Sequence, residues 1–78
     1  MTTDFEHDAA FQSALVRIIP QMRAFARSLC QDATLAEDLA QDAVAKAWSN
    51  RAGFTMGTNI KAWAFMILRN QFYSDKRR

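Results

Sequence analysis

The final third of the sequence contains basic side chains, an amide side chain and flat aromatic rings at helical spacing. Proteins that bind single-stranded nucleic acid use this combination, because Lys and Arg hold phosphates while flat rings stack on unpaired bases. Aromatic and Met side chains at the same spacing also occur in hydrophobic cores, so the periodicity alone leaves both interpretations open. The face in question holds Ala62, Met66, Arg69, Asn70, Tyr73, Lys76 and Arg77, with Trp63 at its border.

A loop is predicted just before this face, over residues 50–58, with the sequence NRAGFTMGT. It contains both glycines of the chain, Gly53 and Gly57, which give the backbone freedom to turn. Thr58 or Asn59 is suited to cap the helix that follows. Phe54, between the glycines, fits either a plug of the hydrophobic core or a ring that contacts nucleic acid.

The charge of the chain is divided between its two parts. Up to residue 42, seven acids stand against three bases, a net charge of −4, whereas from residue 43 seven bases stand against one acid, a net charge of +6. The first part therefore suits a basic partner and the second suits a polyanion.

The sequence contains no motif that indicates an enzyme. One Cys, Cys30, and one His, His7, cannot form a disulfide, a metal cluster or a nucleophile–base pair, and the two glycines do not make a nucleotide-binding fingerprint. We expect a protein that is not an enzyme and has no cofactor. A lone Cys, no signal peptide and no apolar run of about 20 residues indicate a cytoplasmic protein with no membrane contact.

Two helices are expected before the loop. Apolar residues recur every three or four positions from about Asp8 to Leu29, and Pro20 is expected to kink that helix or split it into two, because proline cannot donate the helical hydrogen bond. Residues 1–7 are expected to be frayed, with His7 solvated.

The second helix is predicted to start with a capping box formed by Thr34 and Glu37. Its apolar face holds Leu35, Ala36, Leu39, Ala40, Ala43, Val44, Ala47 and Trp48. The opposite face holds Asp38, Gln41, Asp42, Ala45 and Ser49. Acids on that face are not interleaved with Lys, and the small Ala45 would let another helix approach closely. We therefore predict an all-α, monomeric domain over residues 1–78. It is expected to be a compact bundle of three helices, or of four if the first helix is split at Pro20.

The residues also resemble a known family. The run AEDLAQDAVAKAW, followed by FTMGTNIKAWAFMILRN and KRR, is similar to conserved region two of the extracytoplasmic-function sigma factors of bacterial RNA polymerase. The part GTN-x-x-AW-x-F-x-ILRN looks most like the general-stress-response sigma factors of alphaproteobacteria. The similarity covers about residues 11–78. It implies a transcription initiation factor domain that docks on core RNA polymerase and captures the non-template strand of the promoter minus-ten element.

Roles for individual residues follow from this resemblance. The family's D-L-x-Q-D helix docks on the clamp helices of the largest polymerase subunit, which maps onto Asp38, Leu39, Gln41, Asp42 and Ala45. A base flipped out of the strand enters a pocket built mostly by the loop, whose candidates are Asn50, Arg51, Phe54, Thr55, Met56, Gly57, Thr58 and Asn59. The helix candidates are Lys61, Trp63, Met66, Arg69 and Asn70, and the terminal bases Lys76, Arg77 and Arg78 join Lys61 and Arg69 as phosphate contacts.

In physical terms, Trp63 is expected to stack at the melting fork and Asn70 to bind a base edge. Met66 lies where some relatives carry a polar or basic residue, so base preference does not transfer. The family's second DNA-binding domain is absent, so we expect one domain of a longer protein. Binding of an anti-sigma factor is implied as well. The alternative is a sigma-like decoy, an interaction module that binds an anti-sigma factor without contacting DNA.

Overall fold

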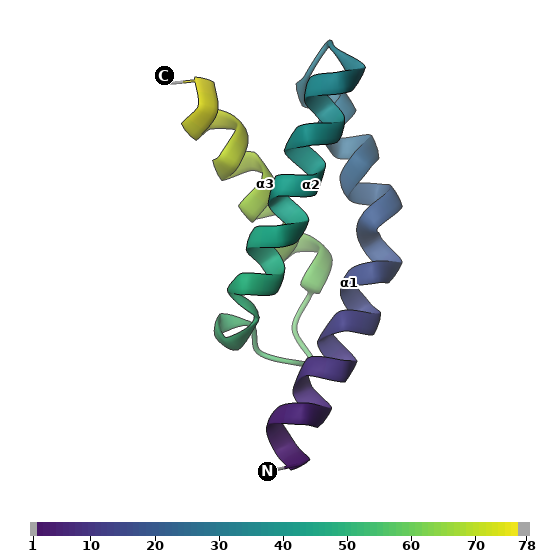
Figure 1. The fold of residues 1–78 in the computed structure, drawn as a ribbon, viewed down its shortest axis with the longest axis vertical. Helices are drawn as coiled ribbons and strands as arrows, with labels where there is room; N and C mark the ends of the chain where they lie inside the picture. Colours follow the sequence, from purple (N-terminus) through teal and green to yellow (C-terminus); the bar gives the residue numbers. More distant parts are fainter. Residues whose placement is uncertain (1, 77–78) are drawn as a thin grey trace.

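The computed structural model describes the backbone of residues 2–76 and the side chains of residues 6–75. Three α-helices and one short 3₁₀ helix follow one another: α1 (Thr2–Leu29), α2 (Ala33–Ser49), η1 (Arg51–Gly53) and α3 (Ile60–Lys76). The part of the chain described contains no strand. The all-α prediction is confirmed, and Figure 1 shows the three helices packed side by side.

Helix α1 starts earlier than predicted and is continuous. It begins at Thr2, so the frayed start predicted for residues 1–7 is wrong for the residues described. It also runs through Pro20 as one helix, so of the two alternatives predicted there, a kink or a split, the split does not occur and the bundle has three α-helices. Pro20 and Val16, whose carbonyl loses its helical donor, are both exposed, and water can replace the missing hydrogen bond there. Ile18 and Met22, buried on either side of Pro20, keep both halves on the core.

Helix α2 is capped by a residue that the sequence interpretation passed over. The side chain of Asp32 accepts hydrogen bonds from the backbone N–H groups of Thr34 at 2.7 Å and Leu35 at 3.2 Å. The predicted capping box, with Thr34 at the cap position, is therefore wrong, and α2 begins at Ala33. The carboxylate of Asp32 satisfies two of the free N–H groups and places a negative charge at the positive end of the helix dipole.

The hydrophobic core lies along the seam where the three helices meet. Helix α2 contributes mainly alanines to it, and these small side chains let α1 and α3 approach closely. The buried residues are Phe11, Leu15, Ile18, Met22 and Ala26 from α1, Ala36, Leu39, Ala40, Ala43 and Ala47 from α2, Phe54 from the loop, and Ala64 and Leu68 from α3. Leu35 and Trp48, predicted on the apolar face of α2, are 59% and 37% exposed.

Helix α1 sets the length of the molecule. Its 28 residues span about 42 Å at the usual helical rise, close to the longest dimension of 43 Å. Helix α2 runs back along α1, and the segment between α2 and α3 crosses toward the N-terminal half of α1 before α3 begins (Figure 1). The loop and the start of α1, far apart in sequence, thus lie at the same end of the bundle.

Candidate nucleic-acid interface

The segment between α2 and α3 is a structured turn. After η1, Gly57 adopts a φ of +95°, a conformation that favours glycine. The backbone N–H and the hydroxyl of Thr58 both donate to the carbonyl of Thr55, at 3.2 Å and 2.6 Å. The side-chain oxygen of Asn59 accepts from the N–H of Ala62 at 3.1 Å, so Asn59 caps α3, as one of the two predicted alternatives. The loop therefore leads into α3 in a defined direction.

An aromatic cluster fixes the first half of this loop to the helices. Phe54 is only 5% exposed, and its ring lies 5.6 Å from that of Phe11 and 5.1 Å from that of Trp63, centroid to centroid. Phe11 and Trp63 meet edge to face at 5.7 Å. Of the two roles open for Phe54, the structure supports the core plug. Trp63 is half-buried in the same cluster, with part of its surface still open.

Arg51 is held by partners within the chain. Its Nε donates to Oδ1 of Asp8 at 3.0 Å, and its Nη1 donates to the carbonyl of Trp48 at 2.9 Å. The guanidinium also lies over the indole ring of Trp48, 4.1 Å from the centroid. The hydrogen bond from Arg51 lowers the pKa of Asp8 from its usual value, while partial burial acts in the opposite direction. Of these three residues, only Arg51 was predicted as part of the site.

His7 also reaches the loop from α1. Its Nε2 lies 3.3 Å from the carbonyl oxygen of Phe54, and its ring stacks on Phe11 at 6.3 Å. The prediction of a solvated His7 is wrong, because its side chain is only 28% exposed. Nothing in the sequence pointed to this contact, since the two residues are 47 positions apart.

The exposed side of α3 carries four of the predicted strand-binding residues, which are Lys61, Met66, Arg69 and Asn70. Met66 is 60% exposed and Tyr73 is 48% exposed, and the guanidinium of Arg69 lies 5.5 Å from the centre of the Tyr73 ring. The ammonium of Lys61 lies 5.6 Å from the ring of Phe65. The other exposed candidates are Asn50, Thr55, Met56, Gly57, Thr58 and Asn59. The side chain of Lys76 and both Arg77 and Arg78 lie outside the described residues.

The predicted polymerase-docking residues of α2 divide between surface and core. Asp38, Gln41, Asp42 and Ala45 are exposed, whereas Leu39 is 5% exposed and belongs to the core. Glu37 on the same helix pairs with Arg23 of α1 at 3.1 Å. A shallow cavity of about 270 Å³ between α1 and α2 is lined by Ile19, Arg23, Ala40, Gln41, Val44 and Ala45. The polar face of α2 thus adjoins a small depression between α1 and α2.

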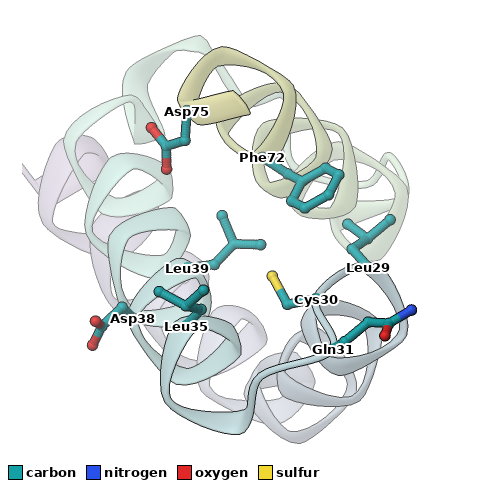
Figure 2. Close-up of a pocket in the computed structure, with 8 residues that line it drawn as sticks. All are labelled: Leu29, Cys30, Gln31, Leu35, Asp38, Leu39, Phe72 and Asp75. Atoms are coloured by element: carbon teal, nitrogen blue, oxygen red, sulfur yellow. The ribbon is translucent and has the colours of Figure 1, made fainter. Parts of the chain in front are cut away.

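A larger groove opens at the far end of the bundle from the loop. Its volume is about 670 Å³, and α1, α2 and α3 all contribute to it. In Figure 2 the leucines, Cys30 and Phe72 surround the opening, with the carboxylates of Asp38 and Asp75 at its edge. Sequence reasoning did not predict this groove, because it forms only where the ends of three helices diverge. Its lining residues are Leu29, Cys30, Gln31, Leu35, Asp38, Leu39, Phe72 and Asp75.

Residues within the described part of the chain contain no group of three or more His, Cys, Asp or Glu side chains placed to hold a metal ion. No described helix is long and apolar enough to cross a membrane.

Comparisons with known proteins agree on one family. Residues 14–78 match Sigma-70 region 2. The chain is 44% identical over 64 residues to the ECF RNA polymerase sigma factor EcfG of Rhodopseudomonas palustris, covering 82% of this chain and 35% of that protein. It is 42% identical over 57 residues to a probable RNA polymerase sigma factor of Haemophilus influenzae, covering 73% and 29% of the two chains.

A solved structure shows the same fold. It is the sigma factor RpoE of Bartonella quintana, crystallised in complex with the anti-sigma factor NepR, and it superimposes with a TM-score of 0.81 at 50% identity. The match covers 87% of this chain and 42% of that chain. The present chain therefore spans less than half the length of each of these relatives.

Proposed function

Because the chain belongs to the Sigma-70 region 2 family, we propose that it recognises and melts the promoter minus-ten element by capturing the non-template single strand. Sigma factors are transcription initiation factors, and the chain is accordingly a binding protein whose work is done by association. Melting is then driven by binding, because unstacked bases are captured from a fluctuating duplex. The cytoplasm is the compartment in which this activity takes place.

The observation that carries the proposal is the surface formed by the loop and the exposed side of α3, hereafter the strand surface. Its described members include the exposed bases Lys61 and Arg69, the amide of Asn70 and the edge of Trp63. The two basic side chains can hold phosphates of the strand, while an amide and a partly open indole offer hydrogen bonding and stacking to its bases. Thr55, Met56 and Thr58 are exposed in the loop, where a flipped base would bind.

The polar face of α2 supplies the second half of the proposal, which is docking on the clamp helices of core RNA polymerase. Asp38 and Asp42 are exposed there and have no basic partner among the described residues, so a basic partner helix can neutralise them. The solved relative was crystallised with an anti-sigma factor. We extend that partnership to this chain, as an inhibitor that covers the surfaces needed for polymerase and DNA.

Fluorescence anisotropy of a labelled non-template minus-ten strand tests the proposal. The chain is titrated together with core RNA polymerase, against a scrambled strand of equal length, over a salt series. We expect the minus-ten strand to bind more tightly, with log K falling by about 0.7 for each phosphate contact per unit of log salt. Equal, salt-insensitive binding of both strands would contradict strand recognition.

Polymerase docking is tested separately by Asp42→Lys, with Glu6→Lys on α1 as a control of equal charge change. Asp42→Lys is expected to weaken binding to core polymerase, because it reverses a charge in the middle of the exposed acidic face. Glu6→Lys should leave it unchanged. Normal docking combined with no preference between strands would instead identify a sigma-like decoy module.

A further inference from the structure

We infer that Asp8 and Trp48 hold Arg51 in place and thereby position the loop for strand capture, so that Arg51 acts as a positioning residue and does not bind phosphate. This inference rests on the proposed function and assigns new roles within the same site. Asp8 comes from α1 and Trp48 from α2, so Arg51 joins the loop to both helices.

Three contacts engage the guanidinium, through two of its five N–H groups and one of its flat faces. Nε is engaged by the carboxylate of Asp8 at 3.0 Å, and Nη1 by the carbonyl of Trp48 at 2.9 Å. One flat face is covered by the indole at 4.1 Å. A phosphate that paired with the Nε–Nη2 edge of Arg51 would have to displace Asp8. Lys61 and Arg69, in contrast, have no acidic partner among the described residues.

The position of Arg51 lets these contacts control the loop. Its carbonyl accepts the N–H of Phe54 at 3.1 Å, which closes η1, and the carbonyl of Phe54 lies 3.3 Å from Nε2 of His7. The loop is therefore attached to α1 at two successive points, through Asp8 and through His7. Beyond Phe54, the described side chains of residues 55–58 form no hydrogen bond or ion pair with α1 or α2, so the placement of these residues depends on this attachment.

Removal of the Asp8 carboxylate should change strand affinity in opposite directions, depending on whether Asp8 positions the loop or acts only through its charge. Asp8 is a negative charge beside a surface proposed to bind a polyanion. If it acted only through its charge, its removal would strengthen strand binding. If it positions the loop, its removal weakens binding, because the competent loop conformation becomes a smaller fraction of the population.

The experiment measures strand affinity for Asp8→Ala, Asp8→Glu, Arg51→Ala and the double variant, with core polymerase present and over a salt series. Glu6→Ala is the matched control, since Glu6 is an exposed acid one half-turn away with no partner among the described residues. We expect Asp8→Ala to weaken binding by about three- to tenfold, Asp8→Glu to recover part of this, and the double variant to match Arg51→Ala. The salt slope should be the same in all of them.

Two results would overturn the inference. One is Asp8→Ala that binds as tightly as Glu6→Ala or more tightly. The other is a salt slope that falls by about 0.7 in Arg51→Ala, which is the loss expected for one phosphate contact to a single strand.

Hydrogen exchange on the free chain provides a readout that does not depend on DNA. Asp8→Ala should speed exchange at the amides of residues 53–58 while those of α2 keep their wild-type rates. Unchanged exchange in the loop would overturn the positioning role. If Asp8→Ala speeds exchange in the loop but the wild-type chain binds no strand, the positioning role stands and the proposed function is what failed.

Discussion

The two ends of the bundle are built in opposite ways. At the loop end, the rings of Phe11, Phe54 and Trp63 close the core, and Arg51 ties the loop to the neighbouring helices. At the other end, the helices diverge around an open apolar groove of about 670 Å³ in which Leu35 is 59% exposed. The difference indicates that one end is held in place by packing and hydrogen bonds within the chain, while the other keeps apolar surface open to solvent.

The largest test of this contrast is Phe11→Ala. Phe11 is fully buried and its ring lies near those of Trp48, Phe54 and Trp63. Its loss should lower the free energy of unfolding by about 3–5 kcal/mol, measured by urea denaturation with circular dichroism. Leu35→Ala at the open end is the control and should change it by no more than about 0.5 kcal/mol. Equal losses at the two ends would remove the distinction between them.

Asn70→Ala tests whether strand binding can be lost without loss of stability at the loop end of the bundle. Asn70 is exposed and outside the aromatic cluster. Loss of its amide should cost about 1–3 kcal/mol of minus-ten strand binding, as for one base-edge contact, with little change in unfolding free energy. Anisotropy and denaturation measure the two quantities. Gln21→Ala, which removes an exposed amide from α1, should affect neither; a strand affinity that survives Asn70→Ala would take Asn70 out of the site.

The two glycines of the loop differ in backbone conformation, and substitution by alanine should therefore have different effects at the two positions. Neither has any atom within 4 Å of an added Cβ, but Gly57 has a φ of +95°. Gly57→Ala should therefore destabilise the fold by about 1–2 kcal/mol, whereas Gly53→Ala should be neutral or slightly stabilising because it restricts the unfolded chain. Thermal unfolding of both variants measures this, and equal effects would show that the backbone conformation at Gly57 is not required.

The smallest effect is the pH dependence of the link between Asp8 and Arg51. The hydrogen bond from Arg51, together with charge interactions with Arg51 and His7, lowers the pKa of Asp8 in the folded chain. Its contribution to stability is therefore present above the ordinary pKa of 3.8 and is lost as the pH falls through the folded value. The stability difference between wild type and Asp8→Asn should therefore shrink as the pH falls below 3.8. A constant difference would mean that the charge of Asp8 does not matter.

Periodicity predicted the helices well because it reports which side chains are buried. Ala36, Ala40, Ala43 and Ala64 all lie in the core on the faces expected of them. The errors concern helix ends and interruptions, where local signals compete. Asp32 and Thr34 are both suited to cap a helix, and only the structure shows that Asp32 does so. Pro20 lies on an exposed side, where the packing of its neighbours outweighs the lost hydrogen bond.

The site was less predictable than the fold, because its decisive contacts join distant parts of the chain. Asp8 and Arg51 are 43 positions apart, and His7 and Phe54 are 47 apart. No spacing rule relates such pairs. The family resemblance placed Arg51 in the loop predicted to contact DNA, but its contacts with Asp8 and Trp48 depend on how the loop returns to α1. Phe54 was open between two roles for the same reason.

The alanines of α2 have a further consequence for a chain of 78 residues. Ala36, Ala40, Ala43 and Ala47 are at most 2% exposed, and an alanine gives up no rotamer freedom when it is buried. Close contact between helices is thus obtained without the side-chain entropy that leucines or methionines would lose. The same alanines have no alternative side-chain conformations through which the seam could repack. The backbone of α2, and with it the exposed Asp38 and Asp42, is therefore held at one distance from its two neighbours.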